Sequence, residues 1–248
     1  MNAFEGPEAH KKLGNWAEYW DQDDFWTDSE IWKINAALFF KRAFSILQPK
    51  PWDKVLNIGC GPGYLEMMLS PHVQSICAVD TSRRYVDLCR EKCSPFRNVQ
   101  AEQLKRKYTD VAMFGSHSLY LCVSVVQYYR NKNEIEDLIR SVQRSALPGA
   151  RMLIADLPLQ RNGLGKMLDF LCSFFLSIRE GYVFDCFFTL LRLNLKSSKY
   201  RTFGKRVKTL SFSHNELRDL IKRLNLKAEI IQKSLSIYAN RPSLWIEF

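Results

Sequence analysis

The stretch Val55-Leu56-Asn57-Ile58-Gly59-Cys60-Gly61-Pro62-Gly63-Tyr64 decides the fold of this 248-residue chain. A short, mostly apolar run typical of a buried strand leads into three alternate glycines, and an apolar helix is predicted from residue 65. Glycine has no Cβ atom, so the backbone can turn tightly and come close to a ligand. The first N–H groups of the following helix can bind a carboxylate or a phosphate. The stretch therefore predicts a ligand-binding turn between a strand and a helix.

Two common phosphate-binding patterns do not fit this turn. The dinucleotide fingerprint requires Gly-x-Gly-x-x-Gly, and its sixth position here is Tyr64. The turn also lacks the Gly-Lys-Ser/Thr ending of a P-loop. Asp80 ends the next apolar run, and a carboxylate at that place can accept hydrogen bonds from both hydroxyls of a ribose. The glycine turn, the helix and Asp80 together predict a nucleoside site.

Strands and helices alternate along the chain, which is the pattern of a mainly parallel sheet with helices on both faces. The predicted strands are residues 54–58, 75–79, 98–101, 119–126, 152–155, 226–232 and 243–248. The predicted helices are residues 31–47, 65–69 and 85–93, one that Asn131 and Glu134 begin, and one that Ser213 and Glu216 begin as a capping box. We expect a single domain, 1–248, with an N-terminal helical cap, 1–50. A helical insertion, 157–212, is expected over the carboxyl edge of the sheet, where ligands bind in such folds.

From about residue 54 to residue 158 the chain resembles the class I S-adenosylmethionine (SAM)-dependent methyltransferases, in particular the broad group that acts on small molecules. The resemblance implies an α/β, Rossmann-like fold: a seven-stranded, mainly parallel sheet with helices on both faces and an antiparallel last strand. It implies SAM as the cofactor. The implied cofactor-binding residues are Asn57, Gly59, Cys60, Gly61 and Gly63 for the methionine part, Asp80 and Thr81 for the ribose, Gln100 and Ala101 for the adenine, and Val123 and Ser124 beside the transferred methyl group.

Two departures from the family pattern stand out. The family usually has Asp or Glu at position 57, whereas this chain has Asn57. The amide keeps an acceptor oxygen but loses the charge, so Asn57→Asp is expected to hold or improve SAM affinity. The segment 108–118 lacks the family's usual Phe-Asp pair and has His117-Ser118 there.

SAM carries an activated methyl group, so the protein must mainly position a nucleophile in line with it, and such orientation can supply about 7–11 kcal/mol of the barrier. Four residues are candidates for catalytic roles near the methyl group: His117, Gln127, Tyr128 and Asp156. His117 is either a base or a structural histidine at a strand start. Asp156 is read as a loop anchor or a hydrogen-bond acceptor for the substrate, and Tyr128 as pocket wall and core.

The insertion gives the best indication of the acceptor. It is rich in apolar residues, namely Met167, Leu168, Phe170, Leu171, Phe174, Phe175, Phe184, Phe187 and Phe188, and a run without acidic residues follows, containing Arg192, Lys196, Lys199, Arg201, Lys205, Arg206 and Lys208. An apolar helix beside a basic stretch suits a lipophilic or anionic small-molecule acceptor, or peripheral contact with a membrane. In the alternative interpretation the aromatic residues are the core of the insertion and the basic run is its solvated face.

Two other functions stay open at this stage. The formal charge of +10 is compatible with an RNA methyltransferase, although no separate RNA-binding module and no Asn-Pro-Pro-Tyr-type motif is found. The loss of charge at Asn57 would also fit a catalytically silent SAM-binding or partner-binding domain. The N-terminal aromatic cluster of Trp16, Tyr19, Trp20, Phe25 and Trp26 is either a lid over the cofactor or a packed cap on the sheet.

Cysteine usage and hydropathy indicate the setting. The seven cysteines are odd in number and form no Cys-x-x-Cys pair, so no disulfide framework and no metal site is predicted. A reduced, cytoplasmic environment fits this pattern. No run of about 20 uninterrupted apolar residues is present, so no transmembrane helix is expected.

Overall fold

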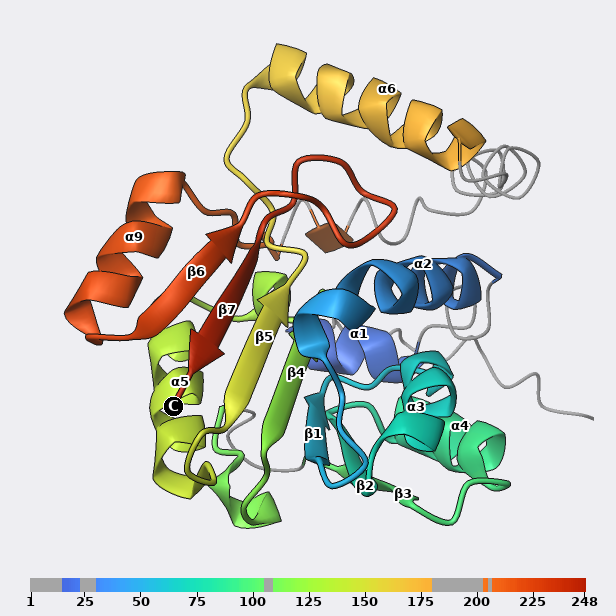
Figure 1. Cartoon of the computed structure of the whole chain (residues 1–248). Coiled ribbons are helices and arrows are strands. Elements are labelled where there is room, and N and C mark those ends of the chain that lie inside the picture. The colour runs from blue at the N-terminus through green and yellow to red at the C-terminus, as the bar shows by residue number, and fades with distance from the viewer. Residues whose placement is uncertain (1–14, 23–29, 105–108, 180–202, 205–206) are drawn as a thin grey trace, which may run out of the picture.

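Seven strands form one sheet in the order β3-β2-β1-β4-β5-β7-β6 in the computed structural model of the chain (Figure 1). The strands are β1 (Lys54–Ile58), β2 (Ser75–Asp80), β3 (Val99–Gln103), β4 (Leu119–Val123), β5 (Arg151–Ala155), β6 (Lys227–Ile231) and β7 (Ser243–Glu247). The structure describes residues 15–22, 30–104, 109–179, 203–204 and 207–248. All seven predicted strands are present. The sheet is therefore the one that the alternation of apolar runs predicts.

The direction of the strands also agrees with the prediction. β1 pairs in parallel with β2 and β4. β2 also pairs in parallel with β3, and β4 with β5. Only β7 runs antiparallel, between β5 and β6. The carboxyl ends of β1, β2 and β4 therefore meet at one edge of the sheet.

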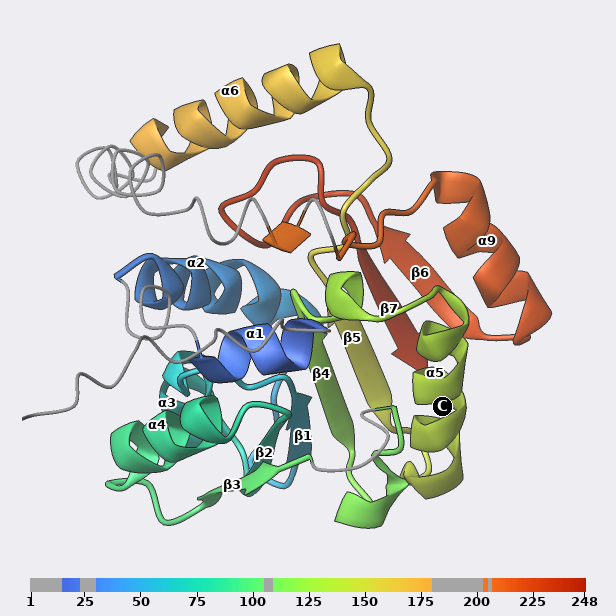
Figure 2. The same ribbon diagram turned by 180° about the vertical axis from the view of Figure 1, so that it is seen from behind.

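Helices cover both faces of this sheet (Figures 1 and 2). One face packs against α2 (Glu30–Leu47), α3 (Tyr64–Leu69) and α4 (Arg83–Cys93), and the other against α5 (Asn133–Ser145) and α9 (His214–Arg223). Alternate residues of a strand point to opposite faces. In β1, Val55 thus joins the core under α2 to α4, while Leu56 and Ile58 join the core under α5 and α9. The same alternation directs Asn57 toward α3.

The helix starts show one confirmed signal and one correction. Ser213 and Glu216 form the predicted capping box at the start of α9. The other predicted start is wrong by one or two residues, because α5 begins at Asn133 and not directly after Asn131. The Asn131 side chain nevertheless accepts from the N–H of Asn133, and the Glu134 carboxylate accepts from the N–H of Arg130. The two side chains satisfy N–H groups at the bend before the helix.

The insertion after β5 contains helix α6 (Gly163–Arg179), which lies apart from the sheet (Figures 1 and 2). The two ends of the insertion come together, since Leu159 and Phe212 form a β-bridge. Phe184, Phe187, Phe188 and the basic residues from Arg192 to Arg206 lie outside the described residues, whereas Lys208 is among them. Within the described part of the chain, no helix is long and apolar enough to cross a membrane.

Candidate functional site

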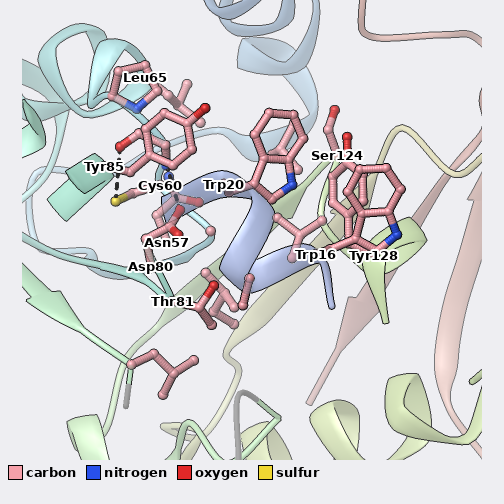
Figure 3. A pocket seen from close by; sticks show the side chains of 18 of the residues that line it. Trp16, Trp20, Asn57, Cys60, Leu65, Asp80, Thr81, Tyr85, Ser124 and Tyr128 are labelled. Carbon is pink, nitrogen blue, oxygen red and sulfur yellow. Dashed lines mark hydrogen bonds between the residues drawn. The ribbon is translucent and has the colours of Figure 1, made fainter. Parts of the chain in front are cut away.

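A cavity of about 450 Å³ opens at the carboxyl ends of β1, β2 and β4 (Figure 3). Its lining combines the glycine turn after β1, Asp80 and Thr81 after β2, the residues after β4, and aromatic side chains from α1 (Trp16–Gln22) and α2. Ligands of open α/β sheets bind at this edge. The cavity therefore lies where the sequence places the nucleoside site.

The glycine turn leaves room for a ligand at one point and packs closely at two others. Gly59, Gly61 and Gly63 all have positive φ angles, 78°, 56° and 88°. A Cβ atom on Gly59 would lie 2.2 Å from Cγ2 of Val125, and one on Gly63 would lie 2.9 Å from Cα of Cys89. A Cβ atom on Gly61 would meet nothing within 4 Å. Gly61 thus faces the open space that a bound molecule would fill, whereas Gly59 and Gly63 serve close packing of the turn.

Asp80 is held in place by the backbone around it. Its carboxylate accepts from the N–H groups of Gly61 (3.0 Å) and Ser82 (2.9 Å). Burial raises the pKa of Asp80 to about 6, although these backbone hydrogen bonds act in the opposite direction. The side chain lies in the cavity wall beside Thr81, so it can accept hydrogen bonds from sugar hydroxyls without moving.

Asn57 lines the same cavity and is paired with the carboxylate of Glu66, which is not among the site residues predicted from the sequence. Its Nδ2 donates to Oε1 of Glu66 at 2.5 Å. Both side chains are buried, with exposed fractions of 3% and 1%. Burial raises the pKa of Glu66 to about 7, while the hydrogen bond from Asn57 lowers it. A Glu within the otherwise apolar run Tyr64–Leu69 was the available signal.

Aromatic side chains close one side of the cavity. Trp16 and Trp20 of α1 pack against Tyr128, with ring centroids 5.0 and 5.4 Å away (Figure 3). Trp16 also packs edge-to-face on Phe203 from the insertion. Helix α1 is tied to the start of α4, because the Ser82 hydroxyl lies within hydrogen-bond distance of the backbone oxygen of Trp20. The aromatic cluster is therefore both packed and part of the cavity wall; Phe25 and Trp26 lie outside the described residues.

Strand β3 reaches the cavity two residues later in the sequence than predicted. Gln100 and Ala101 do not line this cavity; Gln103 and Leu104 do. The reason is the length of β3, which runs to Gln103 and not to residue 101 as predicted. Gln100 is therefore an exposed residue within the strand, and the carbonyl of Ala101 accepts from Nε of Arg90. The carboxyl end of β3, where the adenine ring could bind, is therefore at Gln103.

Of the four catalytic candidates, Tyr128 lines the cavity, and the other three do not. Tyr128 lines the cavity together with Val123 and Ser124. His117 lies before β4, at the amino edge of the sheet, and its Nδ1 contacts the carbonyl of Gly115. Burial lowers the pKa of His117. Because the cavity is at the opposite edge, the structure contradicts a role for His117 beside the methyl group.

Gln127 and Asp156 belong to a buried polar cluster behind the cavity. Asp156 accepts from the hydroxyls of Ser124 (2.5 Å) and Ser236 (2.6 Å) and pairs with Arg241 (3.2 Å). Arg241 also donates to Oε1 of Gln127. The cluster fixes Ser124, at the end of β4, against the loop between β6 and β7. Asp156 thus anchors loops, and the carboxylate is already occupied.

Three groups that could bind a metal also lie beneath the glycine turn. The ligand atoms of Cys60, Glu66 and Cys89 are within 4.8 Å of one another, and all three residues are buried. The hydrogen bond with Cys89 lowers the pKa of Cys60, but burial and the nearby Glu66 and Asp80 raise it, to about 12 overall. A protonated, buried thiol packs as a small apolar group, and these thiols fill the space between the turn and α4.

Comparisons with known proteins agree on one fold and one domain type. Residues 55–149 match a family model described as a methyltransferase domain. Among curated proteins no sequence relative is found. Similar solved structures include the N-methyltransferase NodS from Bradyrhizobium japonicum WM9 in complex with S-adenosyl-L-homocysteine, with a TM-score of 0.54, 12% identity, and coverage of 93% of this chain and 95% of that one.

Two further structures share this architecture. One is a SAM-dependent methyltransferase from Aquifex aeolicus, with a TM-score of 0.54, 12% identity, and coverage of 88% of this chain and 96% of that one. The other is the pyocyanin biosynthetic protein PhzM, with a TM-score of 0.56 and 11% identity, where 86% of this chain covers 55% of the other. At such identities the likeness is one of fold.

Proposed function

Since residues 55–149 match a methyltransferase domain, we propose that the chain is a class I SAM-dependent methyltransferase and transfers the methyl group of SAM to a small, lipophilic acceptor held between the cavity and the insertion. The observation that carries this proposal is the cavity itself, whose lining places the glycine turn, Asp80 and an aromatic wall around one space. SAM, when bound, supplies a methyl group already activated on a sulfonium.

The residues present fit this cofactor. Gly61 leaves open space where a side chain would otherwise stand, and the buried Oδ1 of Asn57 has no hydrogen-bond partner among the described residues. We assign the methionine part to Asn57, Gly59, Cys60 and Gly61, the ribose to Asp80 and Thr81, and the adenine to Gln103 and Leu104. Gly63 supports the turn through its close packing on α4.

The chain's own contribution to the reaction is positioning and exclusion of water. Val123, Ser124 and Tyr128 form the wall at the end of β4, and Trp16 and Trp20 cover it. No histidine is found in the part of the cavity lining that the structure describes. Such a wall suits a nucleophile that arrives without a proton to remove, and aligning it with the methyl group is the main catalytic task.

Helix α6 supports a lipophilic acceptor that is taken up at a membrane surface. Two of its polar residues contact the rest of the protein: Ser173 accepts from the N–H of Ala239, and Asp169 accepts from Asn240 and pairs with Arg161. Its apolar residues are exposed instead, namely Leu164, Met167, Leu168, Phe170, Leu171, Phe175 and Ile178. A helix that presents apolar side chains outward on a chain of charge +10 is suited to the interface of an anionic bilayer.

The acceptor class can be tested with methyl-labelled SAM. The protein is incubated with fractionated cell extract, and the label is followed into lipid, small-molecule and RNA pools. We expect label in the lipid or lipophilic small-molecule pool, and much less of it with a Gly61→Val control. Nuclease-sensitive label in the RNA pool would instead support the RNA methyltransferase alternative, which the charge of +10 favours. SAM binding without label in any pool would support the catalytically silent alternative.

A further inference from the structure

The pair of Asn57 and Glu66 leaves two buried oxygen atoms without a hydrogen-bond partner in the described part of the chain, and Asn57 lies in the wall of the cavity. Oδ1 of Asn57 and Oε2 of Glu66 are buried and have no hydrogen-bond partner among the residues that the structure describes. Buried polar atoms nearly always have a partner in a folded protein. Asn57 lines the cavity, so the missing donor for its Oδ1 is expected from a bound molecule.

Glu66 decides which end of the Asn57 amide faces the cavity. An ionised carboxylate only accepts hydrogen bonds, whereas the amide has an NH₂ donor and an oxygen acceptor. The 2.5 Å bond from Nδ2 of Asn57 to Oε1 of Glu66 therefore turns the NH₂ group inward and leaves the oxygen for the ligand. Without the carboxylate, the amide would be free to reverse and present a donor.

We propose that Glu66 is a positioning residue for the cofactor: it holds Oδ1 of Asn57 toward the α-ammonium group of SAM and supplies from α3 the negative charge that β1 lacks at position 57. This inference rests on the proposed placement of SAM at the glycine turn.

A consequence is that binding of SAM is coupled to a proton. The groups that act on the charge of Glu66 are Asn57 beside it, its own backbone N–H, Asp80 in β2, Cys60 in the turn, and the α4 thiols Cys89 and Cys93. None of these is a cation, and the pKa of Glu66 is accordingly raised to about 7, mainly by burial. An ammonium group close by favours the ionised form. Binding should therefore release a proton near pH 7, and affinity should rise between about pH 6 and 7.5.

The test is a calorimetric titration of SAM into four proteins: wild type, Glu66→Gln, Asn57→Asp, and the double variant. Glu66→Gln should weaken binding about tenfold or more, the size expected for a lost charge-assisted contact. The double variant should recover affinity to within about threefold of wild type, because both oxygens of the carboxylate introduced at position 57 accept and need no orientation. Asn57→Asp alone sets two carboxylates side by side, so its affinity should depend more strongly on pH than that of wild type.

The outcomes separate this inference from the placement of SAM. If Gly61→Val abolishes binding while Glu66→Gln binds like wild type, the site stands and the role of Glu66 is refuted. If the losses of SAM affinity in the two single variants add up in the double variant, the positioning role of Glu66 is likewise refuted, since additive losses indicate a structural role. If folded Gly61→Val still binds SAM, the site itself is wrong. Should Glu66→Gln not fold, proton release by the wild type at pH 7, measured in two buffers of different ionisation enthalpy, decides; no release contradicts the proposal.

Discussion

Glu66 should also govern how the stability of the cofactor-free protein depends on pH. Its folded-state pKa of about 7 lies above the ordinary value of 4.5, so the protonated form favours folding. The stabilisation is complete below pH 4.5 and is lost as the pH rises through 7. The span corresponds to roughly 3 kcal/mol at most. Asp80, raised from 3.8 to about 6, adds an effect of the same sign at lower pH.

Glu66→Gln isolates this contribution because the glutamine oxygen can still accept from Asn57. We expect the variant to gain stability relative to wild type on going from pH 5 to pH 8, by about 2–3 kcal/mol. Urea unfolding of both proteins without SAM at the two pH values measures it. A difference between the proteins that is the same at pH 5 and pH 8 would mean that Glu66 does not titrate in this range.

Asp156 is another buried carboxylate, and its substitution is expected to destabilise the folded protein. It accepts from two serine hydroxyls and pairs with Arg241, and its side chain is 1% exposed. Breaking a buried pair by removing one partner costs about 3–5 kcal/mol, so Asp156→Ala should lose stability by that amount. Its φ of +66° adds strain for alanine. Asp156→Asn keeps a residue that tolerates this φ and controls for the strain; a loss under about 1 kcal/mol in both variants would contradict the anchoring role.

At the residue level, the sequence predicts those parts of the site that follow from one local pattern. Gly61 and Asp80 are predicted because a turn and a strand end mark them, and both line the cavity. Glu66 is missed because its partner, Asn57, comes from another element and only the fold brings the two together. The expectation for Asn57→Asp changes for the same reason, since a carboxylate already lies at 2.5 Å from the amide.

At the level of elements, the strands are predictable because parallel strands buried on both faces read as apolar runs. Their ends are less so. β3 has the exposed Gln100 and Glu102 at alternate positions, and its polar end masks where the pairing with β2 stops. This two-residue difference moves the adenine assignment from Gln100 to Gln103. For His117 the structural alternative agrees with the structure, because the start of a parallel strand lies at the amino edge of the sheet whereas the cavity opens at the carboxyl edge.

The exposed apolar residues of helix α6 are expected to bind membranes, and substitutions can test this. Replacing two exposed phenylalanines by charged residues, Phe170→Glu with Phe175→Glu, should reduce co-sedimentation with anionic vesicles about tenfold or more, because apolar area no longer enters the interface. SAM binding should not change. Met113→Glu is the matched control, since Met113 is equally exposed but lies before β4. Equal vesicle binding by all three proteins would argue against the membrane role of α6.

At the level of the whole molecule, three distant parts of the chain meet around one cavity. α1 contributes Trp16 and Trp20, the sheet edge contributes the glycine turn and Asp80, and the insertion contributes Phe203 behind Trp16. Helix α1 and the described part of the insertion at Phe203 therefore pack together beside the cavity.

The proposed binding of SAM against Gly61 can be measured by a single calorimetric comparison. Calorimetry compares wild type with Gly61→Val and with Gly149→Val, which has a similar positive φ of 74° and equally open surroundings but lies in the turn before β5. Both substitutions strain the backbone alike, and only the first fills the cavity. We predict that Gly61→Val weakens SAM binding about tenfold or more, each factor of ten being about 1.4 kcal/mol, while Gly149→Val binds like wild type. Undiminished binding by a folded Gly61→Val protein would contradict the account.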